Sequence, residues 1–148
     1  MEHLFTGTSE LNLDEKGRLN IPVRHRVALE DGVFMTYGPE GCIWVLPVAK
    51  WEDVHRKAQG IHLPRNVERS LYAGESARPD PQGRLTIPAE LRKHAGLPEK
   101  GASRATLTGA KERLEIWHPS RWQEITSRAS QDGGAYDAYD EIRAQLGL

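Results

Sequence analysis

Two arginines, each directly after a glycine, are the side chains of this sequence best placed for recognition chemistry. Arg18 follows Gly17 and Arg84 follows Gly83. Glycine at such a position predicts a tight turn in which a positive φ or a close backbone approach excludes a β-carbon. An arginine fixed beside a rigid turn can form two hydrogen bonds with guanine O6 and N7 in the major groove of DNA, or it can bind a phosphate.

A purely structural role is the alternative for both arginines. An aspartate stands four residues before each of them, Asp14 before Arg18 and Asp80 before Arg84. Ion pairs within these two sets would hold the turns closed without any ligand. The sequence alone leaves both interpretations open, although two matched turns on outward faces favour recognition at two points.

Further basic and polar residues flank the turns. Lys16 and Gln82 directly precede the glycines, where a side chain either contacts DNA or remains solvated. Each copy also has basic residues shortly after its proline, where a short helix is expected. A solvated helix face is the alternative to DNA contact for this second set, which comprises Arg24, Arg26, Arg92 and Lys93.

The two turns lie in an internal duplication. Residues Asp14–Pro22 read DEKGRLNIP, and residues Asp80–Pro88, 66 positions later, read DPQGRLTIP. Both copies continue to an arginine four residues past the proline, and later to an Ile-Trp pair at Ile43 and at Ile116. A unit of about 45 residues is near the lower size limit for independent folding, so we expect the two copies to share one core.

Apolar and polar residues alternate around each turn, which predicts half-buried strands. The same alternation directs Arg18 and Arg84 outward. Pro22 and Pro88 suit the first position of a short helix, and Gly96 suits the end of the second helix. The expected inward strand residues are Leu11, Leu13, Leu19, Ile21, Leu85 and Ile87, and the expected apolar helix residues are Val23, Val27, Leu91 and Ala95.

The rest of the chain predicts hairpins and helices. A hairpin is expected from residues 33–37 and 42–46, and another from 105–109 and 114–117. We divide the chain into repeat 1 (5–51), a helical connector (52–76), repeat 2 (77–122) and a C-terminal helical tail (123–148). The aromatic residues of the repeats, which are expected to pack in the core or an interface, are Trp44, Trp51, Trp117 and Trp122.

Composition favours a reducing compartment and gives little sign of an enzyme. The chain has 20 Lys and Arg against 21 Asp and Glu, and its one cysteine, Cys42, excludes an intrachain disulfide. No apolar run approaches the ~20 residues of a membrane span, and the first residues do not resemble a signal peptide. The six histidines show no metal-ligand spacing, and no nucleophile or phosphate-binding motif is present. We therefore predict no catalysis, cofactor or metal, and an inert buried Cys42.

The doubled pattern Asp-x-x-Gly-Arg-x-x-Ile-Pro, followed four residues later by arginine, resembles the MraZ family, whose units are similar to AbrB-type swapped-hairpin domains. Phe5-x-Gly7, the run Arg92–Leu97 and the strand Glu115–Trp117 resemble the same family, so the resemblance covers nearly the whole chain. It implies an α+β fold in which two tandem AbrB-like swapped-hairpin β units form one pseudo-twofold barrel with connecting and C-terminal helices. It also implies a cytoplasmic, nucleoid-associated protein that forms ring-shaped homo-oligomers larger than a dimer.

The resemblance further implies a transcriptional regulator that binds double-stranded DNA. Its expected targets are direct repeats upstream of the division and cell-wall gene cluster, where it commonly represses its own operon, with no membrane and no small-molecule substrate. Pro81 and Gln82 depart from the first copy, which predicts weaker reading of DNA by the second turn. Gly17 and Gly83 are structural turn residues, and the implied DNA contacts are Lys16, Arg18, Arg26, Arg84, Arg92 and Lys93.

A second class of function stays open at this stage. The chain could be a ring-forming scaffold that binds a protein partner, with the Gly-Arg turns serving only as structure. Binding of the protein to its own upstream DNA in the presence of competitor separates the two hypotheses.

Overall fold

The computed structural model describes residues 3–131 and 142–148. The described residues divide into two units, one that ends at His118 and one that begins at Pro119. The first unit contains both copies of the duplicated Gly-Arg motif. The second contains helix α5 (Pro119–Gln131), and the middle of the expected helical tail, residues 132–141, lies outside the described residues.

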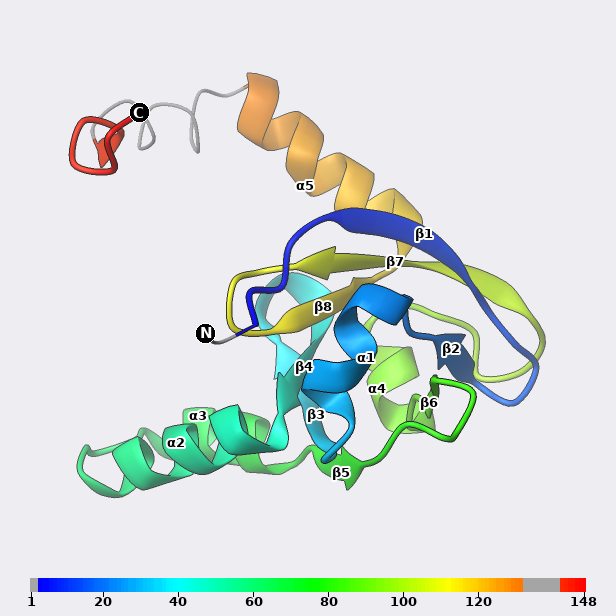
Figure 1. Cartoon of the computed structure of the whole chain (residues 1–148), viewed down its shortest axis with the longest axis horizontal. Coiled ribbons are helices and arrows are strands. Elements are labelled where there is room, and N and C mark those ends of the chain that lie inside the picture. The colour runs from blue at the N-terminus through cyan, green and yellow to red at the C-terminus, as the bar shows by residue number, and fades with distance from the viewer. Residues whose placement is uncertain (1–2, 132–141) are drawn as a thin grey trace. The chain divides into compact units, whose positions relative to one another are not determined.

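The first unit is built on an eight-stranded antiparallel sheet that curls into a nearly closed barrel (Figure 1). Its strand order is β5-β3-β4-β8-β7-β1-β2-β6, so β5 and β6 are the two end strands. The first repeat supplies β1 (Thr8–Leu13), β2 (Arg18–Asn20), β3 (Val33–Gly38) and β4 (Cys42–Pro47). The second supplies β5 (Glu75–Ala77), β6 (Arg84–Thr86), β7 (Ser103–Gly109) and β8 (Leu114–Trp117), and β5 begins two residues before the expected start of this repeat at residue 77.

The two repeats interleave strand by strand. The first strand of each repeat pairs with the third strand of the other, β1 with β7 and β5 with β3. The fourth strands pair with each other, as do the second strands. Because neither repeat completes its own sheet, neither can bury its apolar face alone, and this confirms the expected swapped-hairpin arrangement.

The strand pair β2–β6 marks the pseudo-twofold centre of the duplicated motif. Leu19 is opposite Leu85, Arg18 is opposite Thr86, and Asn20 is opposite Arg84. The ladder extends symmetrically, because the Ile21 amide donates to the Gly83 carbonyl at 2.9 Å and the Ile87 amide donates to the Gly17 carbonyl at 2.7 Å. Each repeat therefore contributes the same sequence motif to one two-stranded ribbon, and the two copies run antiparallel.

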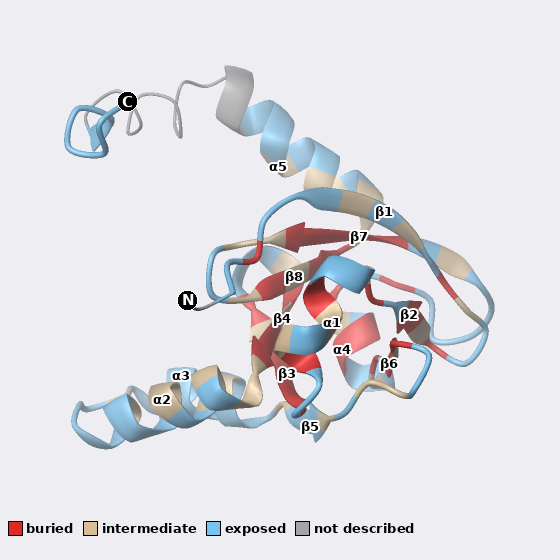
Figure 2. Cartoon of the chain, viewed as in Figure 1, coloured by how far each residue is buried: buried red, intermediate tan, exposed pale blue. Residues whose placement is uncertain are grey.

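The alternation seen in the sequence predicts the core correctly. Figure 2 shows buried residues concentrated on the central strands, while the two connector helices are exposed or half-buried. Of the inward residues expected from the alternation, Leu11 is half-buried, and the five that are fully buried are Leu13, Leu19, Ile21, Leu85 and Ile87. Cys42 is also buried, and burial raises the pKa of its thiol to about 12, so this thiol stays protonated and unreactive at neutral pH.

A short helix follows each proline, α1 (Val23–Leu29) in the first repeat and α4 (Ala89–His94) in the second. Pro22 and Pro88 are the N-cap residues, with ψ of 141° and 144°, rather than the first helical residues that we expected. Gly96 follows α4 with a φ of 72°, as expected for a helix stop.

Helix α1 runs through Val23 and Val27 as expected, but these two residues do not face the core. Leu91 and Ala95 are buried in the second repeat, but Val23 and Val27 are 74% and 76% exposed. The residues of α1 that face the core are instead His25 and Leu29. In a helix of seven residues only one i, i+4 pair reaches the barrel, and a buried histidine takes the place that an apolar residue would be expected to fill.

The remaining elements are the two expected hairpins and two helices between the repeats, the first of which begins at Val48 rather than at residue 52. Strands β3 and β4 enclose a short helical turn, η1 (Pro39–Gly41). The connector consists of α2 (Val48–Gln59) and α3 (Arg65–Tyr72), neither of which has a buried residue. Trp51 of α2 stacks on Phe34 with ring centroids 3.8 Å apart, while Trp44 and Trp117 both donate a hydrogen bond to Glu115.

Candidate nucleic-acid interface

The two Gly-Arg turns have nearly identical backbones. Gly17 and Gly83 have φ of 75° and 80°, as the sequence predicted. In each turn the glycine amide donates to the aspartate carbonyl, and the aspartate amide donates to the arginine carbonyl, at 2.9 to 3.0 Å. These paired hydrogen bonds close the turn, and they fix the position of the Cα atom of the arginine that follows the glycine.

The aspartates hold both turns and both arginines. In the first turn Asp14 Oδ1 accepts from the amides of Lys16 and Arg18, each at 2.9 Å, and Oδ2 accepts from Arg18 Nε at 2.7 Å. Asp80 does the same with Gln82 and Arg84, and its Oδ2 lies 2.7 Å from Arg84 Nε. The ion pairs considered from the sequence are therefore present in both copies.

Hydrogen bonding keeps these carboxylates charged. The Arg18 backbone amide is the main cause that lowers the pKa of Asp14 below its usual value, and the Arg84 amide does the same for Asp80. The ion pair adds to the effect in each turn. Both aspartates are half-buried at most, so their contribution is to fix geometry rather than to supply much stability.

These ion pairs engage only one edge of each guanidinium. In Arg18 the described structure shows Nε bonded to Asp14 and no further partner for Nη1 or Nη2 among residues 3–131 and 142–148. The end-on pair Nη1 and Nη2 is one that binds guanine or phosphate in two places. For Arg18 a structural ion pair and a recognition role are thus compatible, because Asp14 orients the arginine and leaves both terminal nitrogens available.

Arg18 and Arg84 lie on the same outward face of the β2–β6 pair. Leu19 and Leu85 point into the core, so the residues before and after them, Asn20 and Thr86 included, point outward. Arg18 is opposite Thr86, which makes Arg84 its diagonal neighbour. Diagonal neighbours of this kind lie about 7–8 Å apart, with their Cβ atoms somewhat closer.

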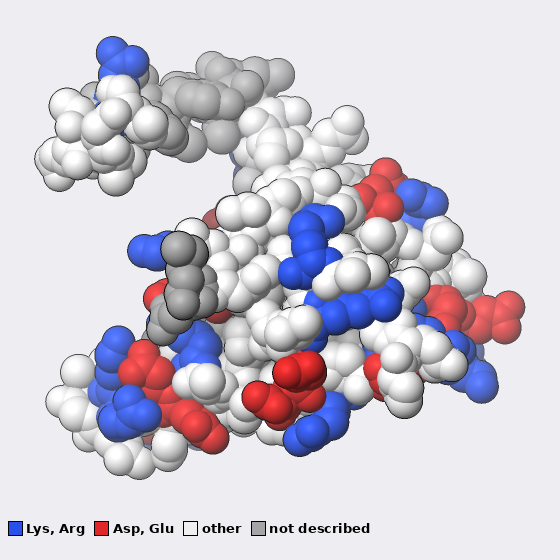
Figure 3. Space-filling model, viewed as in Figure 1, with Lys and Arg blue, Asp and Glu red and all other residues white. Residues whose placement is uncertain are grey.

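A shallow hollow of about 570 Å³ lies beside this strand pair. Asp14 is its one acidic residue, and Val23 of α1 contributes an exposed apolar side chain. Figure 3 shows basic side chains gathered over α1, in the middle of the face viewed. The basic residues that line the hollow are Arg18, Arg24, Arg26 and Arg84.

The remaining DNA contacts implied by the family resemblance differ in solvent exposure. Lys16 and Lys93 are exposed. Arg26 is half-buried and donates from Nε to the Ile21 carbonyl at 2.8 Å, whereas Arg92 is only 9% exposed. Arg92 donates from Nη1 to the Glu99 carbonyl at 3.0 Å.

Arg24 lines the hollow although the resemblance does not include it. Pro22 begins α1 directly after the strand, so the first turn of the helix stays beside the strand pair. The sequence could have indicated this position of Arg24, because Arg24 follows Ile21 by only three residues and the chain cannot move far from the strand pair in that length. The same position in the second repeat is Glu90, so only the first repeat has a positive charge there.

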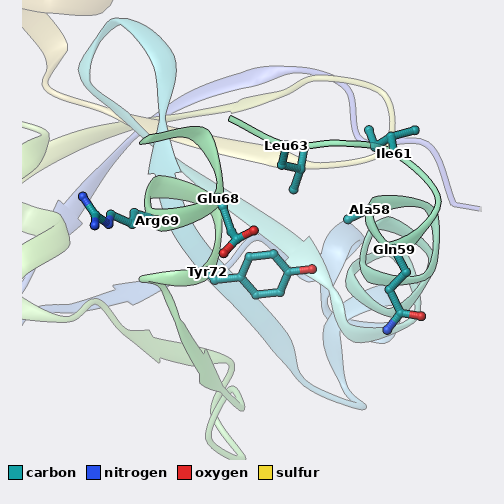
Figure 4. Close-up of a pocket in the computed structure, with 7 residues that line it drawn as sticks. All are labelled: Ala58, Gln59, Ile61, Leu63, Glu68, Arg69 and Tyr72. Carbon is teal, nitrogen blue, oxygen red and sulfur yellow. The ribbon is translucent and has the colours of Figure 1, made fainter. Parts of the chain in front are cut away.

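A second hollow, of about 470 Å³, lies in the helical connector (Figure 4). Figure 4 shows Tyr72 of α3 extending toward α2, where Ala58 and Gln59 form the opposite side. Ile61, on its rim, is 63% exposed. Exposed apolar residues around an open hollow favour contact with another protein surface over chemistry.

Among the described residues, no group of three or more His, Cys, Asp or Glu side chains is arranged to hold a metal ion. Within the same part of the chain, no helix has the length and apolar character needed to cross a membrane.

Comparison with known proteins gives one family. The family model described as "MraZ protein, putative antitoxin-like" matches residues 4–74 and again residues 71–139, one match for each repeat. A protein named transcriptional regulator MraZ from Saccharopolyspora erythraea is 39% identical, over 87% of this chain and 91% of that protein. Proteins of the same name from Lactobacillus delbrueckii subsp. bulgaricus and Deinococcus radiodurans are 34% and 38% identical, over 97% and 79% of this chain and 96% and 83% of theirs. The tandem family match, the relatives and the interleaved repeats agree, and the chain belongs to the MraZ family.

Proposed function

We propose that this protein is a sequence-specific DNA-binding transcriptional regulator whose reading element is the β2–β6 strand pair. The observation that carries the proposal is the pairing of two matched arginines, Arg18 and Arg84, on one outward face. A two-stranded β-ribbon fits the major groove of B-DNA. Diagonal arginines about 7–8 Å apart span roughly two base-pair steps of ~3.4 Å, so both can reach base edges at one site.

The surroundings of the ribbon support phosphate contacts. The hollow beside it contains Arg24 from α1, and Lys16 is exposed at the first turn. Phosphate contacts set the register of a protein on DNA, while base contacts supply specificity. We assign Arg18 and Arg84 to base reading and Lys16, Arg24 and Lys93 to phosphate contact.

The name of the relatives supports the regulatory part of the proposal. Each of the three is a transcriptional regulator by name. From the family resemblance we propose that the target is a set of direct repeats upstream of the division and cell-wall gene cluster, that the protein represses its own operon, and that it is cytoplasmic and associated with the nucleoid. We also propose the functional division into repeat 1 (5–51), connector (52–76), repeat 2 (77–122) and tail (123–148).

The test is binding of the full-length protein to its own upstream region. Fluorescence anisotropy with a labelled duplex is compared with a scrambled duplex of the same length, with competitor DNA present. We expect tight binding to the native duplex only, and its loss in the Arg18→Ala/Arg84→Ala double variant. Arg128→Ala on α5, an exposed arginine outside both the ribbon and the connector, is the matched control and should bind as the parent does. Equal affinity for both duplexes would contradict the proposal.

We further propose that the protein acts as a homo-oligomer larger than a dimer, in a ring. One chain has a single ribbon and few phosphate contacts, so its affinity at physiological salt should be low. Several linked ribbons on repeated operator boxes raise apparent affinity by ~10²–10⁴ when their spacings match. The surface available for association is the connector, where no residue of α2 or α3 is buried and where the exposed large apolar residues are Ile61, Val67 and Tyr72.

Light scattering of the free protein tests this assembly, together with binding to one, two and three operator repeats. We expect a mass well above that of a dimer, affinity that rises with repeat number, and a smaller particle for Ile61→Asp. A monomer in solution, or equal affinity for one and three repeats, would overturn it.

The exposed connector also keeps a second function in view, a ring-forming scaffold that binds a protein partner without direct DNA readout. The same anisotropy experiment separates the two, because a scaffold predicts no preference for the native duplex and no effect of Arg18→Ala.

A further inference from the structure

The arginine on each short helix packs against the glycine turn of the other repeat. A β-carbon added to Gly17 would lie 2.7 Å from Cζ of Arg92, well inside van der Waals contact. A β-carbon added to Gly83 would collide with Nε of Arg26 in the same way. The glycine of each turn is therefore covered by a guanidinium that comes from the opposite copy of the motif.

The crossing follows from the strand pairing. The Gly17 carbonyl accepts from the Ile87 amide, and Ile87 directly precedes the proline that starts α4. Four residues past that proline is Arg92, so α4 brings it to the turn of the first repeat. The symmetric bond from Ile21 to Gly83 brings Arg26 of α1 to the turn of the second repeat.

Both arginines are held by backbone oxygens, which limits their freedom to contact a ligand. Arg26 Nε donates to the Ile21 carbonyl, and its Nη2 donates to Asn20 Oδ1 at 3.1 Å. Arg92 Nη1 donates to the Glu99 carbonyl, and its Nε is buried without a hydrogen-bond partner in the described part of the chain. A buried polar atom without a partner costs free energy, which a purely packing side chain would avoid.

We propose that Arg92 and Arg26 are positioning residues that act across the repeats, Arg92 on Arg18 and Arg26 on Arg84, through the glycine turn on which each guanidinium packs. The proposal rests on the DNA-binding function argued above. Each guanidinium fixes the turn backbone from below, and the aspartate of the turn fixes the arginine from the side. The reading arginine thus depends on a residue of the other copy, 74 positions away for Arg18 and Arg92 and 58 for Arg84 and Arg26.

Double-variant cycles on DNA affinity test the crossed dependence. Arg92→Lys keeps the charge and most of the length, but it loses the planar group that covers the turn. With Arg18→Ala already present, we expect Arg92→Lys to have little further effect on Kd. With Arg84→Ala present, we expect it to weaken binding by the same factor as in the parent. Coupling of Arg92 to Arg84 instead, or equal coupling to both, would overturn the proposal.

Hydrogen exchange of the free full-length protein gives a readout that does not depend on DNA. Arg92→Lys should speed exchange in the peptide covering residues 14–20 and leave that covering 80–86 unchanged, while Arg26→Lys should do the reverse. Faster exchange only in the peptide of the same repeat would overturn the proposal even if the parent binds DNA. If the parent binds no DNA but exchange crosses as expected, the proposed function fails and the crossed support of the turns stands.

Discussion

The two Gly-Arg turns share one backbone conformation, but the side chains that surround their arginines differ. The glycine φ values, the aspartate bonds and the arginine ion pair at 2.7 Å are the same in both. The first turn has Lys16 before its glycine, where the second has Gln82. Gln82 accepts a hydrogen bond from Arg84 Nη2 at 3.0 Å, so one of the terminal nitrogens of that arginine is already engaged.

Solvent exposure of the arginines does not explain weaker DNA binding by the second turn, because the Arg84 side chain is 35% exposed and that of Arg18 is 27%. What differs is charge and prior bonding. The first repeat adds Arg24 beside the ribbon, where the second has Glu90. Duplication has kept the residues that build the turn and varied those that surround it, so we expect equal structural roles and unequal shares of binding energy.

The largest effect should come from the glycines, where the two turns are alike. Gly17→Val and Gly83→Val place a β-branched residue at positive φ, which costs about 1–3 kcal/mol, and each also displaces an arginine from beneath the turn. We expect both variants to lower the free energy of unfolding by at least that amount and to weaken DNA binding. Urea denaturation followed by circular dichroism measures the loss. A variant that unfolds like the parent would show that the turn does not need glycine.

The next effect concerns the arginines, where we expect the turns to differ. Arg18→Ala should weaken specific binding by roughly 1–3 kcal/mol, or about 5–150-fold, because one bidentate base contact is lost. Arg84→Ala should cost the same or less, since Gln82 competes for its guanidinium. Both variants should retain the circular dichroism spectrum of the parent. A larger loss for Arg84→Ala, measured by anisotropy on the same operator, would reverse the ranking of the two turns.

Most features that the two turns share could be predicted from the sequence, and the physical reasons can be named. Period-two alternation placed Leu19 and Leu85 inward and both arginines outward, because strand geometry leaves only two directions. Glycine before arginine predicted the positive φ. The contact of Arg92 with Gly17 could not be predicted, because spacing within one copy says nothing about which copy a helix will cover. The exposure of Val23 and Val27 was missed because apolar character alone does not show which side of a short helix meets the barrel.

A smaller effect should follow from exchanging the residues before the glycines. Lys16→Gln makes the first turn resemble the second, and Gln82→Lys does the opposite. Removing one phosphate contact should reduce the slope of log K against log salt concentration by about 0.9, and adding one should increase it by about 0.9. Affinities measured across a salt series give the slopes. Unchanged slopes in both variants would mean that neither position contacts phosphate, and that the turns differ only through their arginines.

The smallest effect at neutral pH concerns the contribution of the short helices to the free energy of unfolding. This effect grows as the pH is lowered. His25 of α1 and Leu91 of α4 occupy equivalent positions, 66 residues apart, and both are buried. His25 Nδ1 lies 2.9 Å from His3 Nε2, and its ring also packs against Phe5. Burial is the main cause that lowers the pKa of His25 from 6.5 to about 4, and the positive charge of Arg24 adds to the shift.

The sign of the pH effect follows from where each state takes up the proton. Unfolded His25 is protonated as pH falls through about 6.5, whereas folded His25 stays neutral until pH approaches about 4. Between these values the unfolded state binds more protons, so the free energy of unfolding should decrease as pH falls. His25→Leu makes the first helix resemble the second and should flatten the pH dependence between 6.5 and 4, with little change above pH 7. The lowered pKa values of Asp14 and Asp80 affect parent and variant alike, so they cancel in the comparison. Urea midpoints across this range provide the measurement, and a parental slope in His25→Leu would show that another group causes the acid sensitivity.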